Sequence, residues 1–93
     1  MLTVRNVFTA KPGMASKLAK QLHDAWHERG FRILTDTISQ MNTVVLEFDV
    51  KNLSEYEAQY KEYSTDPRVK KAMEGYTDLY LSGRREVLQR YPS

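Results

Sequence analysis

Asn6 and a series of tyrosines are the residues of this 93-residue sequence whose types and spacing best suit recognition of a small molecule. Asn6 stands between Val4 and Phe8 at alternate positions, so the three side chains point to the same side of an extended strand. An amide buried there without a partner costs about 1–3 kcal/mol. We therefore expect Asn6 to hydrogen-bond a bound ligand or, in an ordinary core, a tyrosine hydroxyl or the backbone.

The tyrosines in the second half of the chain recur at helical spacing, and they are Tyr56, Tyr60, Tyr63, Tyr76 and Tyr80. A buried tyrosine presents an apolar ring and a hydroxyl that needs a partner. Several of them beneath a sheet would line a pocket for a planar or phenolic ligand, whereas a simple core stripe of the same spacing needs no ligand. On the first interpretation, the predicted ligand-binding residues are Asn6, Tyr60, Tyr63 and Tyr76.

Other kinds of reactive site have little support. His23 and His27 stand four residues apart, but they lie away from the apolar stripe of their predicted helix and no third metal ligand is evident. The sequence has no cysteine, no nucleophile elbow, no phosphate-binding loop and no close pair of carboxylates. We predict neither a metal site nor a cofactor, and neither hydrolase nor kinase activity.

Length and charge restrict the class of protein. Residues 1–93 suffice for one domain with a thin core, which an oligomeric partner would help to complete. The 14 basic and 12 acidic residues are scattered along the chain, and a net charge of +2 argues against a nucleic-acid partner. No segment has the pattern of a signal peptide or a membrane span, so we expect a cytoplasmic protein with no membrane partner.

The first half of the chain predicts a strand, a helix and a hairpin. Residues Met1–Ala10 alternate with the period of a strand, and Met14–Arg29 carry an apolar stripe at helical spacing that Gly30 closes. Two further strands, Phe31–Gln40 and Thr43–Val50, flank a short turn.

The second half predicts a long, broken helix and a last strand. Ser54 and Glu57 fit a capping box that starts the helix, and Asp66-Pro67 breaks it before Ser82-Gly83 end it. Residues Arg84–Tyr91 form the last strand. The order is that of an α+β, ferredoxin-like βαββαβ fold, with a four-stranded antiparallel sheet and two helices on one face. We expect the strand order fourth, first, third, second.

RNA-recognition modules share this order, but the residues do not suit RNA. Such modules stack bases on an aromatic residue in the first strand, where this chain has Thr3. Their third strand carries a basic-glycine-aromatic pattern, whereas residues 42–47 contain no glycine and no basic residue, and Glu47 places an acidic group on the face that a phosphate backbone would approach.

The sheet face without helices predicts a partner. Its side chains would be β-branched and charged: Thr3, Arg5, Val7, Thr9, Thr43, Val45, Glu47 and Asp49. We expect a second copy to lie against it, sheet to sheet, with Arg5, Val7, Val45 and Glu47 in the interface. Arg5 and Glu47 would pair across neighbouring strands and help to set the register between the two surfaces.

The whole chain resembles the dimeric α+β barrel superfamily, which includes antibiotic-biosynthesis monooxygenase-like and NIPSNAP-like proteins. The resemblance rests on Val7–Gly13, Phe31–Leu34, Val44–Phe48, Thr65–Pro67 and Ser82–Glu86. It implies a small homodimer with a pocket between the sheet and the second helix. Some members are oxygenases that need neither metal nor flavin, and others bind and degrade haem.

Sites of that superfamily place an Asn on the first strand, a Trp on the second helix and a His or Tyr on or after that helix. Only the Asn carries over, onto Asn6, because Trp26 and both histidines are on the first helix. Haem is therefore not expected. Two hypotheses follow. The first is a homodimeric barrel that binds a compact aromatic or phenolic ligand and either oxidises it, as a monooxygenase-like enzyme, or isomerises it. The second is a non-catalytic dimerisation or ligand-sensing module whose pocket is filled by its own side chains.

Overall fold

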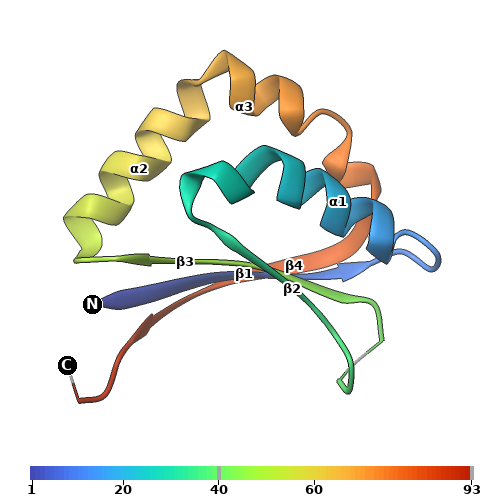
Figure 1. Cartoon of the computed structure of the whole chain (residues 1–93), viewed down its shortest axis with the longest axis horizontal. Coiled ribbons are helices and arrows are strands. Elements are labelled where there is room, and N and C mark those ends of the chain that lie inside the picture. Colours follow the sequence, from blue (N-terminus) through green and yellow to red (C-terminus); the bar gives the residue numbers. More distant parts are fainter. Residues whose placement is uncertain (40, 93) are drawn as a thin grey trace.

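A computed structural model of the chain, which describes residues 1–39 and 41–92, has the predicted order of strands and helices (Figure 1). The strands are β1 (Leu2–Ala10), β2 (Arg32–Thr35), β3 (Thr43–Val50) and β4 (Tyr80–Gln89). The helices are α1 (Ala15–Trp26), α2 (Leu53–Thr65) and α3 (Pro67–Ala72), with the 3-10 turns η1 (His27–Arg29) and η2 (Tyr76–Asp78). This is the ferredoxin-like α+β fold.

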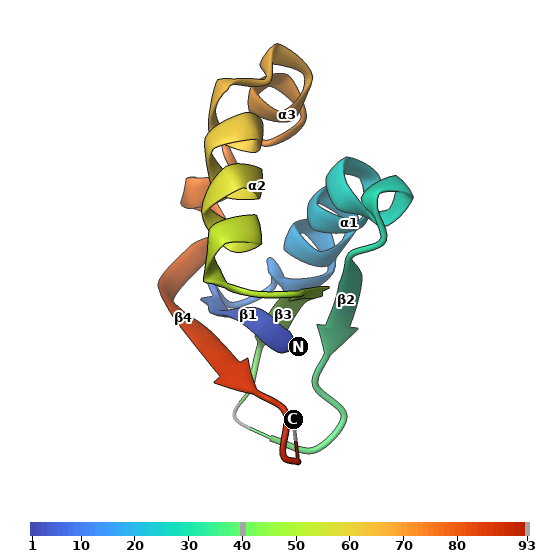
Figure 2. The same ribbon diagram turned by 90° about the vertical axis from the view of Figure 1, so that its left-hand side faces the viewer.

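The strands form one antiparallel sheet in the order β2-β3-β1-β4, which confirms the predicted strand order. Figure 1 and Figure 2 show α1, α2 and α3 on the same side of this sheet. Within the described residues no helix lies on the other side. We call the two sides the covered face and the uncovered face.

The core fills the space between the covered face and the helices. Val4 on β1 and Val44 on β3 are fully buried there, as are Leu18 and Leu22 on the apolar stripe of α1. Alternate residues of a strand point to opposite faces, so the same alternation places Arg5 and Val45 on the uncovered face.

The first half differs from its prediction mainly in β2. Gly30 has φ +81°, the left-handed conformation expected of a residue that ends a helix. β2 stops at Thr35, and the side chain of the next residue, Asp36, accepts a hydrogen bond from Thr43 N at 3.1 Å. Gln40, at the end of the predicted strand, lies outside the described residues.

The start of α2 was predicted two residues too late. Asn52, not Ser54, is the capping residue, and its side chain accepts from Glu55 N at 2.9 Å. The carboxylate of Glu55 in turn accepts from Lys51 N at 3.1 Å. Asn caps a helix as well as Ser does, and the Asn-x-x-Glu spacing comes first along the chain.

The break at Asp66 is confirmed, but the helix does not run on to Leu81. Asp66 accepts from Arg68 N at 2.8 Å and starts α3 with Pro67 in its first turn. β4 begins at Tyr80 instead of Arg84, so Gly83 is a strand residue and not a helix end. A side-chain carbon at Gly83 would lie 3.1 Å from Cδ1 of Phe8, so a larger residue at this position would require the Phe8 ring to shift.

The uncovered face carries a row of alternating charges across all four strands. Arg32, Glu47, Arg5 and Glu86 are neighbours in register, and we call them the charge row. Arg32 Nη2 lies 2.8 Å from Glu47, and Arg5 Nε lies 3.3 Å from the other oxygen of that carboxylate. The predicted Arg5–Glu47 pair is confirmed as an ion pair, although Arg5 Nε lacks hydrogen-bond geometry.

Val7 and Val45 lie side by side on the uncovered face and are only 6% and 5% exposed in the single chain. Longer side chains flank them in register, Leu34 beside Val45 and Arg84 beside Val7. Two apolar residues of this face, Leu34 and Leu88, remain exposed. Separately, no helix among the described residues has the length and apolarity needed to cross a membrane.

Candidate functional site

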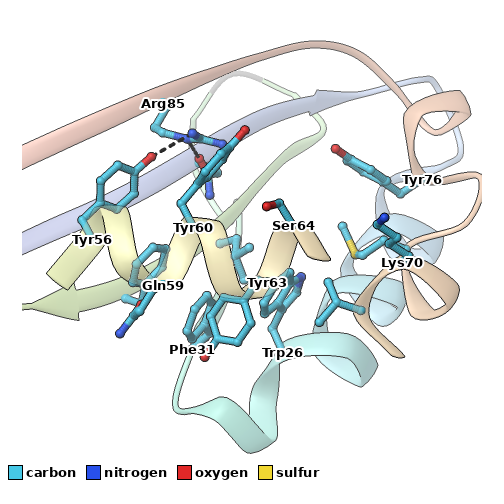
Figure 3. Close-up of a pocket in the computed structure, with 15 residues that line it drawn as sticks. Trp26, Phe31, Tyr56, Gln59, Tyr60, Tyr63, Ser64, Lys70, Tyr76 and Arg85 are labelled. Carbon is cyan, nitrogen blue, oxygen red and sulfur yellow. Dashed lines mark hydrogen bonds between the residues drawn. The ribbon is translucent and has the colours of Figure 1, made fainter. Parts of the chain in front are cut away.

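A cavity of about 450 Å³ lies between the covered face and the pair of helices α2 and α3 (Figure 3). The four residues predicted to bind a ligand all line it. They come from three elements: Asn6 from β1, Tyr60 and Tyr63 from α2, and Tyr76 from η2. Tyr76 and Tyr80 were expected on the second helix, but the chain leaves the helix at Ala72 and Tyr80 opens β4.

Asn6 has a partner that the sequence did not suggest. Arg85 Nε donates to Asn6 Oδ1 at 2.8 Å, and Arg85 Nη1 donates to the hydroxyl of Tyr56 at 2.8 Å (Figure 3). Among the described residues, neither a tyrosine hydroxyl nor a backbone N–H donates to the side-chain oxygen of Asn6; Arg85 stands between the amide and Tyr56. We call these three residues the Asn6–Arg85–Tyr56 chain.

The register of the sheet explains why Arg85 reaches the cavity. Asn6 on β1 is paired with Arg85 on β4, so both side chains point to the covered face. Gly83 precedes Arg85 and Val87 follows it on that face, at alternate positions. The predicted strand Arg84–Tyr91 has the same alternation of side chains. However, Arg84 and Arg85 are consecutive and point to opposite faces, and the sequence alone does not show which of them faces the helices.

Aromatic rings form the wall of the cavity opposite Arg85. Trp26 stacks on Phe31 with ring centroids 5.0 Å apart, and Phe31 stacks on Phe48 at 4.2 Å. The ring of Tyr63 meets Trp26 edge-on at 5.1 Å. Trp26 thus lines the cavity from α1, although the superfamily pattern places its tryptophan on the second helix.

Two buried polar atoms of the wall have no partner among the described residues: the indole Nε1 of Trp26 and Oε1 of Gln59. Buried polar atoms are nearly always hydrogen-bonded in folded proteins. Both residues line the cavity. Such atoms are typical of a site that a ligand or solvent completes.

The tyrosines differ in their surroundings. Tyr60 is 57% exposed and stands at the rim, where the guanidinium of Arg85 lies 5.5 Å from its ring centroid. Tyr76 is deeper, with its ring edge-on to Phe8. Burial, and next the neighbouring Tyr80, raises the pKa of the Tyr76 hydroxyl above 10. Tyr76 is therefore a neutral hydrogen-bonding group at physiological pH.

The lining of the cavity is positively charged. Arg85 and Lys70 are its charged residues, and none of the described residues that line it is an aspartate or a glutamate. A second hollow of about 390 Å³ adjoins it and shares Asn6, Tyr76 and Arg85. Apolar rings with a few polar groups at defined positions are the usual composition of a small-molecule site.

The histidines lie outside this site. The rings of His23 and His27 stack with centroids 4.3 Å apart on α1 and η1, and their side chains are 59% and 43% exposed. Neither residue lines the cavity. Among the described residues, no group of three or more His, Asp or Glu side chains is placed to hold a metal ion.

No protein-family model matches the sequence, and no curated protein matches it either. Solved structures do match the fold. A NIPSNAP domain protein from Burkholderia xenovorans aligns with 99% of this chain and 96% of its own, with a TM-score of 0.84 and 16% identity. A NIPSNAP family protein from Agrobacterium tumefaciens aligns with 98% of this chain and 93% of its own, with a TM-score of 0.85 and 10% identity.

A candidate antibiotic biosynthesis monooxygenase from Deinococcus radiodurans aligns with all of this chain and 95% of its own, with a TM-score of 0.70 and 17% identity. At such low identities the likeness concerns the fold alone. It confirms the resemblance expected from the sequence: the chain has the fold of the NIPSNAP-domain and antibiotic biosynthesis monooxygenase-like proteins.

Proposed function

We propose that the protein binds a compact aromatic or phenolic ligand in the cavity. The observation that carries this proposal is the open volume of about 450 Å³ next to Asn6, Tyr60, Tyr63 and Tyr76. Ligand sites typically have volumes of roughly 300–1,000 Å³. The aromatic wall would stack on the ring of the ligand, while hydroxyl, amide and guanidinium groups would bind its polar edge.

The alternative from the sequence, a module whose pocket is filled by its own side chains, is less well supported. Such a module would close the space around Asn6 with tyrosine hydroxyls. Instead the nearest tyrosine partner, Tyr56, is held by Arg85, and the space beyond remains open. A ligand-sensing role without catalysis is compatible with the cavity and is distinguished below by oxygen uptake.

We propose that the reaction is cofactor-independent, monooxygenase-like oxidation of the bound ligand. O₂ would oxidise the enolate or phenolate form of the substrate: one oxygen atom forms a new C=O bond at a CH₂ carbon, and the other leaves as water with the two hydrogens of that carbon. The donors of Arg85 would stabilise the substrate oxyanion, because fixed donors aimed at a developing charge lower the barrier. The fold likeness to a candidate monooxygenase supports the same reaction class.

Blocking the cavity tests binding. Ser64 lines the cavity on α2, so Ser64→Trp should obstruct it, whereas Ser54→Trp adds the same ring at the exposed start of that helix. A phenol or quinone at a hundred times its dissociation constant should stabilise the wild-type chain by about 2.7 kcal/mol in a thermal-shift screen. We expect Ser54→Trp to keep this effect and Ser64→Trp to lose it; no stabilisation by any compound would contradict the proposal.

Oxygen uptake tests the reaction. Anthrone offers a compact aromatic skeleton with one CH₂ carbon that can become a carbonyl. We expect the protein to consume one O₂ per quinone formed, and Asn6→Ala to slow this reaction. If the protein binds such compounds but consumes no oxygen above the spontaneous rate, the ligand-sensing role replaces the enzymatic one.

We also propose that residues 1–93 form one domain. We propose a cytoplasmic location, because a chain without cysteine needs no oxidising compartment. Finally, we propose that two copies pair through their uncovered faces. Arg5, Val7, Val45 and Glu47 would lie in that interface. The support is a face without helices among the described residues, where Leu34 and Leu88 are 43% and 47% exposed. Light scattering after size exclusion should give twice the mass of the chain; a monomer at micromolar concentration would contradict it.

A further inference from the structure

We propose that the cavity selects ligands that carry an anionic oxygen group, and that Arg85 is the residue that sets this preference. This inference rests on the proposed binding function and narrows it to acidic aromatic compounds, such as aryl carboxylates and phenols that are ionised at neutral pH. Neutral and cationic compounds of the same shape would bind more weakly.

The first observation is that Arg85 lacks a carboxylate partner. Every other arginine of the chain has an aspartate or glutamate oxygen within 4.0 Å: Arg5, Arg29, Arg32, Arg68, Arg84 and Arg90. Among the described residues, Arg85 alone has only neutral hydrogen-bond partners, Asn6 and Tyr56. Its positive charge therefore remains available to a bound anion.

The second observation is that Arg85 is held in place and still has donors to offer. Asn6 accepts from Nε and Tyr56 accepts from Nη1, each at 2.8 Å. A guanidinium has five N–H donors, so the second donor of Nη1 and both donors of Nη2 are left over. A fixed guanidinium with free donors suits the two oxygens of a carboxylate or the single oxygen of a phenolate.

The third observation is the position of Arg85 in the fold. It stands on the covered face, in register with Asn6, between positions occupied by Gly83 and Val87. Arg85 is an exposed residue that also lines the cavity, so a ligand in the cavity can reach its guanidinium directly. Lys70, on α3, lines the same cavity and adds a second positive charge without adding a carboxylate.

Three naphthalene derivatives of similar shape would test the preference: 2-naphthoate, 2-naphthamide and 2-naphthylmethylammonium. We expect calorimetric titration of the wild-type chain to give at least about ten-fold tighter binding of the carboxylate than of the amide, and weaker binding still of the ammonium compound. Added salt should weaken carboxylate binding and leave amide binding nearly unchanged.

Substitutions assign the preference to Arg85. Arg85→Gln should bring the affinities for carboxylate and amide within about two-fold of each other, and Arg85→Lys should retain part of the difference because it keeps the charge. Arg68→Gln is the matched control: it removes an arginine charge from α3, where Arg68 is 84% exposed and does not line the cavity, and it should leave the ratio unchanged. Circular dichroism reports whether each variant is folded.

The outcomes separate the inference from the function on which it rests. Equal binding of carboxylate and amide by the wild-type chain would overturn the anion preference and leave aromatic binding intact. Binding of none of the three compounds would overturn both. A ratio that persists in folded Arg85→Gln would overturn the role of Arg85, and if that variant fails to fold, the wild-type ratio and its salt dependence still decide the preference.

Discussion

The two faces of the sheet differ in whether their charged side chains have oppositely charged neighbours. On the uncovered face, Arg32, Glu47, Arg5 and Glu86 alternate in sign across the strands, so each charge has an opposite neighbour. On the covered face, the hydrogen-bond partners of Arg85 among the described residues are the neutral Asn6 and Tyr56. One face balances its charges within the chain, while the other leaves a positive charge beside a cavity.

This difference shows what each face needs from outside the chain. The charges of the charge row balance one another, so the row can set the register between two paired surfaces without binding an additional ion. An arginine held by neutral groups beside an aromatic wall is incomplete until an anion or water reaches it. We therefore associate the uncovered face with a second copy and the covered face with a small ligand.

The largest effect should come from the apolar part of the covered face. Phe48 is 8% exposed and stacks on Phe31, so Phe48→Ala should lower the free energy of unfolding by about 3–5 kcal/mol. Leu88→Ala on the uncovered face, where the side chain is 47% exposed, should cost less than about 1.5 kcal/mol. Urea denaturation measures both, and equal losses would mean that the two faces are not distinct.

The next effect concerns assembly through the uncovered face. Glu47→Gln removes the carboxylate between Arg5 and Arg32 and leaves two cations side by side. If a second copy covers this face, the dissociation constant of the dimer should rise at least about ten-fold. Glu57→Gln, on the exposed side of α2, is the control. Analytical ultracentrifugation measures both, and an unchanged constant for Glu47→Gln argues against this interface.

A smaller effect on stability, with a clear effect on binding, is expected from Asn6→Ala. It takes the acceptor from Arg85 Nε and should lower stability by about 1 kcal/mol, since solvent can reach the exposed guanidinium. Ligand binding should weaken at least about ten-fold while the dimer stays intact. Thr3→Val, on the same strand but the uncovered face, should leave binding unchanged. Unaltered ligand affinity of Asn6→Ala would remove Asn6 from the site.

Acid should act through the uncovered face. Hydrogen bonds from Arg32, and next from Thr3, lower the pKa of the Asp49 carboxyl below 3.8. The ionised Asp49 therefore stabilises the folded chain fully at pH values above the pKa that its carboxyl has in the unfolded chain. This stabilisation is lost as the pH falls through the lower pKa that the carboxyl has in the folded chain. In Asp49→Asn, the loss of stability below about pH 4 should be shallower than in the wild-type chain. Parallel acid curves in urea denaturation would show that Asp49 contributes little.

Alkali should act, more weakly, through the covered face. The raised pKa of Tyr76 means that the folded chain keeps this hydroxyl neutral when the unfolded chain begins to ionise it near pH 10. Stability should therefore fall as the pH rises beyond 10, and Tyr76→Phe should make this fall shallower. An alkaline stability curve of Tyr76→Phe that runs parallel to the wild-type curve would contradict this role of Tyr76.

The sequence predicted the strands and the sheet order well because both follow from local patterns. Alternation placed Val4 and Arg5 on opposite faces, and Asp66-Pro67 marked the break in the second helix. Tyr80 was assigned to a helix because it continues a helical spacing from Tyr76, whereas pairing with β1 decides its structure. Local spacing cannot show a hydrogen-bonding edge that lies seventy residues earlier in the chain.

The sequence predicted only those residues of the candidate site that local patterns place beneath the sheet. Asn6, Tyr60, Tyr63 and Tyr76 have local patterns that place them beneath the sheet, and the cavity contains them all. Arg85 and Trp26 enter through the β1–β4 register and the position of α1 over the sheet, which no local pattern records. One pattern in the sequence could have placed Arg85 in the site: it alternates with Val87 along the last strand, although that strand was predicted to begin at Arg84 and begins at Tyr80.

Trp26 makes the central claim directly measurable, because it is the only tryptophan of the chain and it lines the cavity. Nuclear magnetic resonance of the labelled protein gives one indole N–H signal, which can be followed during titration with 2-naphthoate. A ligand that occupies the covered-face cavity should shift this signal in a saturable manner, and Ser64→Phe, which obstructs the cavity without adding a second indole, should weaken that response. Saturable binding that leaves the Trp26 signal in place would put the ligand elsewhere and contradict the assignment of this cavity as the binding site.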